Sequence, residues 1–257
     1  MTSRRGLFAL GLVASLLVGS GGTEEAEARE RRSIRKSAPP VSHRRVRTAP
    51  SLTRPRRATP KPLIVIDPGH GGHDPGAVGV QGSLEKTIVL AVAQELRRAL
   101  LATGRYRVAL TRDSDTFLTL RARLDFTRRS HAALLISLHA DSAPGARGAS
   151  AYTLLGAVPG SAGPMNASVR LARLAVAEVG RVTPLLDNPH REAGFAVLRA
   201  SNIPSILVEL GFLSNRHDEV SLGRAGHRRG LARALARAVD NWFVGDGPLV
   251  IPSDATG

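Results

Sequence analysis

The stretch LIVIDPGHGGHDPGAVG, residues 63–79, begins as a run of apolar residues and then breaks into Asp67, prolines, glycines and the histidines His70 and His73. A short, continuously apolar run bounded by turn residues is typical of a strand buried on both faces of a parallel sheet. Polar side chains that follow such a strand lie at its carboxyl end, where open α/β sheets bind their ligands. The stretch therefore predicts a buried strand that leads into a functional loop.

The same alternation continues along the chain. Strand-like runs recur at 106–110, 133–138, 149–155 and 205–210, and helical patterns occur at 84–103, 118–130, 165–180 and 227–243. The first of these helical patterns has apolar residues at a spacing of four, and Gly104 stands where helices place a terminal glycine. Apolar strands that alternate with helices predict an α/β fold with a mostly parallel central sheet flanked by helices on both faces.

Residues 1–28 have the pattern of a cleaved secretory signal. A positive start precedes an apolar segment, Gly6 to Gly19, and the small-residue motif at Ala26 to Ala28 follows. The apolar segment is short for a permanent membrane anchor. SRRGLF, residues 3–8, also resembles a twin-arginine export signal, for which an ordinary secretion signal is an equal alternative. We expect an exported bacterial protein in the periplasm, the cell wall or the extracellular space.

Residues 29–61 form a basic tract rich in proline and arginine. The tract holds twelve Lys or Arg against one acid, Glu30, and so carries +11 of the chain's net charge of +15. A segment with so little apolar periodicity is expected to be a disordered linker. The tract could bind an anionic wall polymer or a membrane surface, or it could be a solvated spacer. We do not expect it to bind nucleic acid. The folded domain is then residues 62–245, followed by a tail at 246–257.

The chain contains no cysteine, so any metal must be held by His, Asp or Glu. The run ALLISLHAD leads into His139, PSILVELGF contains Glu209, and Glu85 lies in the opening turn of the first helix. A carboxylate in an apolar strand is costly to bury unless it is paired or used, although a salt-bridged core acid is an alternative. Likewise, each histidine could be a neutral imidazole satisfied by the backbone. Two histidines and two glutamates at neighbouring strand ends together favour a metal site.

Zinc suits these residue types, because catalytic zinc is usually held by three His or carboxylate groups and one water. Such a site lowers the pKa of its water towards about 7. A further carboxylate outside the metal shell can accept the water proton and pass it to a leaving amine.

Four ordered blocks carry a family resemblance. IVIDPGHGGHDPGAVG with LEK, TRDSD with LTLRAR, LLISLHAD, and FAVLRASNIPSILVELGFLSN resemble the zinc-dependent N-acetylmuramoyl-L-alanine amidases of the bacterial cell wall, over about residues 62 to 244. The resemblance implies one Zn²⁺ held by His70, Glu85 and His139, with Glu209 as the catalytic base and acid. It implies hydrolysis of the amide between N-acetylmuramic acid and L-alanine in peptidoglycan, and it gives His73 no ligand role.

Two departures from the family pattern are visible. Many relatives have Asn where this chain has Asp141, which could alter hydrogen bonding around the site or contacts with substrate. Division-associated relatives carry an inserted helix that blocks the zinc site until a partner displaces it. Between His139 and Phe195 this chain has room for one strand, one helix and a loop, so we expect an unoccluded enzyme; whether it has an activator protein stays open.

Further residues of the matching blocks are expected to support the site. Arg112, Asp115 and Arg121 are expected to organise the turn and helix after the second strand rather than to contact substrate. Asp67 is expected to orient a metal-bound imidazole, with capping of a turn as the alternative. The segment 184–192 is read as a loop that could border the substrate groove.

Two other functions compete with the amidase. A non-catalytic wall-binding protein would be expected to have lost one of the four site residues, and none is lost. A zinc peptidase that acts elsewhere on the stem peptide would use the same chemistry; the ordered blocks disfavour it, but residue types alone do not.

Overall fold

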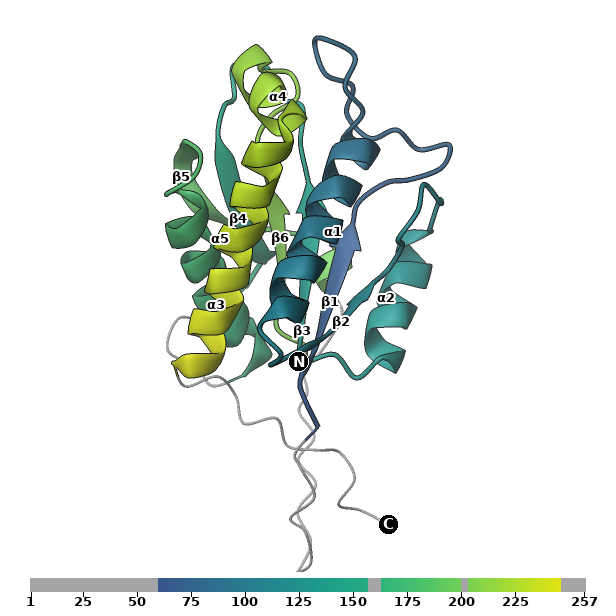
Figure 1. Ribbon diagram of the computed structural model, residues 1–257, viewed down its shortest axis with the longest axis vertical. Coiled ribbons are helices and arrows are strands. Elements are labelled where there is room, and N and C mark those ends of the chain that lie inside the picture. Colours follow the sequence, from purple (N-terminus) through teal and green to yellow (C-terminus); the bar gives the residue numbers. More distant parts are fainter. Residues whose placement is uncertain (1–59, 157–162, 200–202, 246–257) are drawn as a thin grey trace, which may run out of the picture. The chain divides into compact units, whose positions relative to one another are not determined.

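The apolar run at the start of the quoted stretch forms β1, the second strand from one edge of a six-stranded sheet (Figure 1). The computed structural model describes residues 60–156, 163–199 and 203–245. The strands are β1 (Leu63–Pro68), β2 (Arg107–Leu110), β3 (Leu134–His139), β4 (Ala149–Leu154), β5 (Leu185–Ala193) and β6 (Ser205–Glu209), in the sheet order β2-β1-β3-β6-β4-β5. All neighbouring pairs are parallel except β4 with β6. The prediction of a mostly parallel sheet is confirmed.

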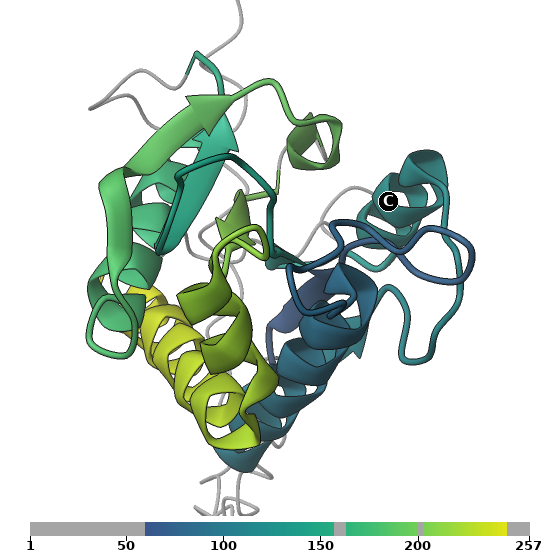
Figure 2. The ribbon, with the colours of Figure 1, turned by 90° about the horizontal axis from the view of Figure 1, so that it is seen from above.

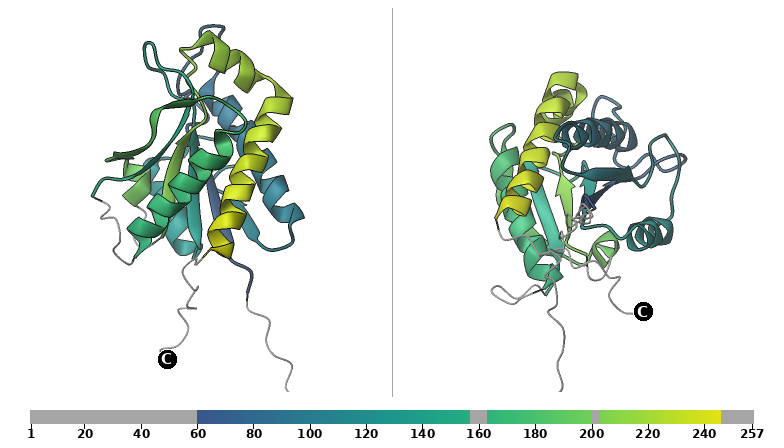
Figure 3. Two further views of the ribbon diagram at one scale, coloured as in Figure 1. Left: turned by 90° about the vertical axis from the view of Figure 1, so that its left-hand side faces the viewer. Right: turned by 60° about the horizontal axis from the view of Figure 1, so that its bottom comes forward.

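Helices cover both faces of this sheet (Figures 2 and 3). They are α1 (Glu85–Ala102), α2 (Leu120–Arg129), α3 (Pro164–Val179), α4 (Arg216–Gly223) and α5 (Ala225–Val244), with a 3₁₀ turn η1 (Ala196–Arg199). Side chains alternate between the two faces of a strand. Ile64 and Ile66 of β1 accordingly join the large core beneath α1, α3 and α5, whereas Val65 joins a smaller cluster with Val197 of η1 and with side chains of α2.

Two elements differ from the sequence-based expectation. Residues 185–193 are not a loop but the edge strand β5, which pairs with β4 alone. Its largely polar, partly exposed residues lack the apolar pattern by which buried strands are detected. The helix α4 was also not predicted; it is only eight residues long, and its start is fixed by the Asn215 side chain, which accepts hydrogen bonds from the backbone of His217 and Asp218.

Three predicted segments lie outside the described residues. These are the signal at 1–28, nearly all of the linker at 29–61 and the tail at 246–257. Among the residues that the structure describes, no helix has the length and apolar character needed to cross a membrane.

Candidate metal centre

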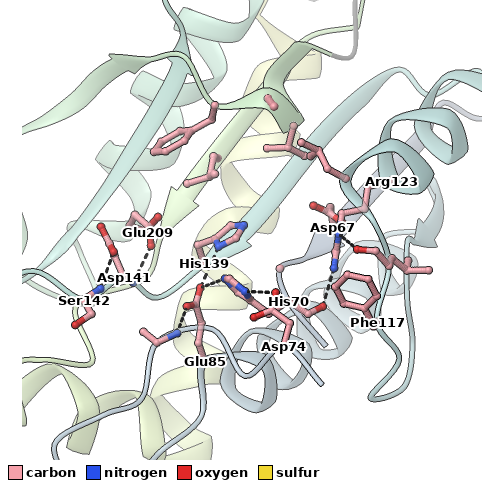
Figure 4. Close-up of a pocket in the computed structure, with 18 residues that line it drawn as sticks. Asp67, His70, Asp74, Glu85, Phe117, Arg123, His139, Asp141, Ser142 and Glu209 are labelled. Carbon is pink, nitrogen blue, oxygen red and sulfur yellow. Dashed lines mark hydrogen bonds and ion pairs between the residues drawn. The ribbon is translucent and has the colours of Figure 1, made fainter. Parts of the chain in front are cut away.

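The three residues expected to bind metal lie together at the carboxyl edge of the sheet (Figure 4). One ligand atom from each of His70, Glu85 and His139 lies within 4.8 Å of the others. Oε1 of Glu85 is 3.2 Å from Nε2 of His70 and 3.0 Å from Nδ1 of His139. Two imidazoles and one carboxylate at these distances could hold a metal ion, and this donor set is the one that catalytic zinc sites use.

Strand register brings the two histidines together. Pro68 of β1 lies opposite Leu138 of β3, and the amide of Gly69 donates to the carbonyl of Leu138 at 3.0 Å. The chain then turns at His70, whose φ of 57° is unusual for a residue with a side chain. Gly69 makes the close approach possible, because a Cβ atom there would lie 2.4 Å from the His139 ring.

Glu85 is the first residue of α1 and is buried, with 3% of its surface exposed. Its Oε2 accepts from the amide of Ala77 at 2.8 Å, and its Oε1 accepts from the amide of Ala140 at 3.0 Å. Burial opposes the charged form of this carboxyl, but hydrogen bonds from His139 and His70 outweigh burial and lower its pKa. Glu85 is therefore anionic at neutral pH, and its two oxygens are held by two different backbone amides.

Asp74 is the group that orients a histidine of the cluster. Its Oδ2 lies 2.8 Å from Nδ1 of His70, and its Oδ1 accepts from the amide of Gly76. When Asp74 accepts from Nδ1, Nε2 is left free to bind a metal. Hydrogen bonding to Glu85 is the largest cause of a raised pKa at His70, and Asp74 adds to it. Sequence reasoning missed Asp74, although it follows His70 by four residues.

The expected role of Asp67 is wrong, because among the residues that the structure describes its carboxylate hydrogen-bonds to Arg123, Thr111 and Ser137 and to no imidazole. Oδ1 accepts from Arg123 Nη1 at 2.7 Å and from Thr111 at 2.6 Å, and Oδ2 accepts from Ser137 at 2.9 Å. Burial favours a higher pKa for Asp67, but the Arg123 charge and these hydrogen bonds lower it below its ordinary value. Asp67 therefore anchors a buried arginine.

Arg123 holds the backbone that carries the first histidine. Nη1 donates to the carbonyl of Pro68 and Nη2 to that of His70, each at 2.7 Å. Arg121, which the sequence predicted to organise the turn and helix after β2, is 92% exposed, and its ion pair with Asp125 at 3.7 Å lies within α2. Sequence reasoning missed Arg123. Arg123 and Thr127 are buried together on one face of α2, which is the helical periodicity that could have identified Arg123.

Arg112 and Asp115 organise the same loop from its other side. Arg112 donates to the carbonyls of Pro68, Gly69 and Lys86 and also to Ser114 in its own turn. Asp115 accepts from the amide of Gly72 and from Lys86 Nζ. Both residues thus link the turn after β2 to the histidine loop and to the start of α1.

Glu209 ends β6 directly beside His139, its partner in the register of β3 and β6. Only 5% of Glu209 is exposed, and its Oε2 accepts from the amide of Asp141 at 2.9 Å. Burial raises its pKa well above the ordinary value, and the charges of Asp141 and Glu85 raise it further. A carboxyl with a raised pKa is suited to accept a proton and to hold it until a leaving group takes it.

One cavity of about 650 Å³ unites these groups. The three cluster residues, Glu209 and Asp141 line it together with apolar side chains that include Phe117 and Phe195. His73 lies outside the cluster, as expected; it is exposed, and its ring centroid is 4.1 Å from that of Phe117. The arrangement can hold a cation beside a protonatable carboxyl in an open cavity, which is suited to metal-assisted hydrolysis.

Known proteins share this fold and sequence pattern. The amidase AmiC of Neisseria meningitidis is 36% identical over 221 residues, which cover 71% of this chain and 53% of that relative. The chain thus spans about half the length of this curated relative. The solved structure of AmiC2 from Nostoc punctiforme has a TM-score of 0.64 and 32% identity, and the match covers 72% of this chain and 99% of that one.

A third similar protein was solved with a partner. The CwlD amidase of Clostridioides difficile, in complex with the GerS lipoprotein, has a TM-score of 0.64 and 26% identity, covering 72% of this chain and all of that chain. The family model described as N-acetylmuramoyl-L-alanine amidase matches residues 64–241, which include the metal cluster and Glu209. The chain belongs to the N-acetylmuramoyl-L-alanine amidase family of hydrolases.

Proposed function

We propose that this protein is a zinc-dependent amidase that hydrolyses the bond between N-acetylmuramic acid and the L-alanine of the stem peptide in peptidoglycan. The observation that carries the proposal is the placement of His70, Glu85 and His139 around one point of a cavity that also contains the buried carboxyl of Glu209. Family membership supplies the substrate class.

Zinc bound by the three cluster residues would polarise the scissile carbonyl and lower the pKa of a water molecule. The protein's own groups prepare this site. Asp74 holds Nδ1 of His70, so that the neutral ring presents Nε2, and the amides of Ala77 and Ala140 fix the two oxygens of Glu85. Arg123 keeps the backbone carbonyl of His70 in place from behind.

Glu209 moves the proton in this proposal. The Asp141 amide holds one of its oxygens, Oε2, and the other has no protein partner among the described residues. That free oxygen would take the proton of the attacking water and then deliver it to the departing amine of L-alanine. Burial and the neighbouring carboxylates raise the pKa of Glu209, which favours holding the proton between these two transfers.

Mass spectrometry of the products from purified peptidoglycan tests the reaction. We expect glycan strands that end in free lactyl groups, together with intact stem peptides. Cleavage within the stem peptide would support the zinc peptidase instead of the amidase. Cleavage between sugars would refute both the amidase and the peptidase hypotheses. A protein that binds peptidoglycan without cutting it would be the wall-binding alternative, which the full set of four site residues disfavours.

The cellular setting is part of the proposal. Residues 1–28 would direct export to the periplasm or cell wall, and the basic tract at 29–61 would contact an anionic wall polymer or a membrane surface, or serve as a spacer. The described elements between His139 and Phe195 are β4, α3 and β5, and the cluster lines an open cavity. Activity of the purified protein without an activator is therefore expected; activity only after a partner is added would contradict it.

A further inference from the structure

We propose that Phe117, supported by His73, forms a binding surface for the sugar ring of the muramyl group, on the glycan side of the site. Phe117 lines the cavity and leaves 38% of its surface exposed. Its ring lies 4.1 Å from that of His73, with an angle of 39° between the ring planes. This inference rests on the proposed amidase function, because it assigns one half of that substrate to one wall of the cavity.

The position of Phe117 is fixed by its surroundings. The backbone of Gly72 packs so closely under Phe117 that a Cβ atom at Gly72 would lie 2.8 Å from the Phe117 amide. Asp115 accepts from the Gly72 amide at 2.8 Å, and Lys86 Nζ donates to both the Gly72 carbonyl and Asp115 at 2.7 Å. The ring is thus presented to solvent by a hydrogen-bonded support, as expected of a binding surface rather than of a loose loop tip.

The direction of the reaction decides which half of the substrate lies here. Glu209 and Phe117 lie on opposite sides of the histidine pair (Figure 4). The departing amine of L-alanine must reach Glu209 to receive a proton, so the stem peptide extends on the Glu209 side. The muramyl sugar, on the carbonyl side of the same bond, then extends past His70 towards Phe117.

The chemistry of the surface matches a sugar face. A pyranose ring presents polarised C–H groups on its faces and hydroxyls at its edge, and an aromatic ring carries negative charge density on its face. Stacking on Phe117 would bury the C–H groups and leave the hydroxyls in water. An aliphatic side chain of similar size would supply apolar area without this charge density. A leucine variant therefore distinguishes stacking on the aromatic face from simple burial of apolar area.

A second phenylalanine of the cavity lining provides a matched control. Phe195 is also 38% exposed and also lines the cavity, and its ring contacts Tyr152 at 5.2 Å between centroids. If exposed aromatic area alone bound sugars, the two phenylalanines would contribute equally.

The test uses the full chain and a peptide-free oligosaccharide of alternating N-acetylglucosamine and N-acetylmuramic acid, with binding measured by NMR titration. We expect Phe117→Leu to weaken binding about three- to tenfold, which corresponds to the usual strength of an aromatic contact beyond its buried area. Phe117→Tyr and Phe195→Leu should each stay within about twofold of the parent protein.

Equal affinities for the parent and Phe117→Leu, an equal loss in Phe195→Leu, or no binding by the parent would each overturn the assignment. Phe117→Tyr keeps the ring, so retained affinity there with a loss in Phe117→Leu assigns the effect to the aromatic ring; an unchanged melting temperature of Phe117→Leu excludes a folding defect. The proposed function fails separately: a parent protein that binds the oligosaccharide through Phe117 but releases no lactyl-ended glycan would refute the amidase and leave the sugar surface supported.

Discussion

Replacement of Arg123 by methionine should destabilise the protein and loosen the backbone that carries His70. The change leaves the Asp67 carboxylate, only 1% exposed, with hydrogen bonds from Thr111 and Ser137 but without its cation. Removal of one partner from a buried ion pair costs about 3–5 kcal/mol. For a domain of this size each kcal/mol lowers the melting temperature by roughly 2–4 °C, so we expect a decrease of roughly 6–20 °C.

Urea denaturation of the parent protein, Arg123→Met, Asp67→Asn and the double variant measures this effect as a thermodynamic cycle. Because the two residues are in direct contact, the double variant should lose less stability than the sum of the single variants. Arg121→Met, two positions earlier on the exposed side of α2, should be close to neutral. A loss below about 1 kcal/mol in Arg123→Met would refute the reasoning, since the buried charge would then be stable without its partner.

The same pair predicts a dependence on pH. The folded-state pKa of Asp67 is lowered, so the pair's contribution is fully present above the unfolded value of about 3.9 and is lost as the pH falls through the folded pKa. In Arg123→Met, burial without the cation should raise the folded-state pKa of Asp67. As the pH falls, Asp67 of the variant is then protonated, and the cost of its unpaired buried charge disappears. The difference in the free energy of unfolding between the parent protein and Arg123→Met should therefore decrease towards about pH 4 and below. A difference that stays constant from pH 7 to pH 3 would contradict this.

Three further predictions concern the metal centre and its supporting loop. Gly69→Ala should weaken zinc binding at least about tenfold in a chelator competition, because its Cβ would lie 2.4 Å from the His139 ring; unchanged affinity would show that the ring can move freely. Glu209→Gln should lose turnover but still bind zinc, so that zinc raises its melting temperature, whereas zinc should not raise the melting temperature of His139→Ala. Retained turnover in Glu209→Gln would refute the proposed role of Glu209 as the proton carrier. Glu219→Gln should speed amide hydrogen exchange in residues 79–83, because the Glu219 carboxylate accepts from two amides there; unchanged protection would show that other contacts hold the loop.

The three candidate ligands stand out in the sequence because each lies next to a strongly patterned element. His70 follows β1, His139 ends β3 and Glu85 begins α1. Parallel strands end at the same edge of a sheet, so apolar runs that end in polar residues indicate which side chains converge. The edge strand β5 has no such run.

The supporting contacts could not be found in this way. The sequence gives no reason to choose Asp74 over Asp67 as the partner of His70, because both flank the same turn. The choice depends on the turn at His70, where φ is positive and the ring meets Asp74, and on Arg123, which engages Asp67. Arg123 in turn acts through the three-dimensional packing of α2 against β1.

The sequence by itself determined the α/β architecture, which depends on local periodicity, and it drew attention to two histidines and two glutamates beside the ends of apolar runs and a helix start. The family resemblance then divided these four into candidate ligands and a candidate base. Only the tertiary structure decided which carboxylate orients His70, which arginine holds the loop, and that Phe117 and Glu209 lie on opposite sides of the cluster. Those relations depend on side-chain directions between segments distant in the chain, and residue order does not fix such directions until the elements pack.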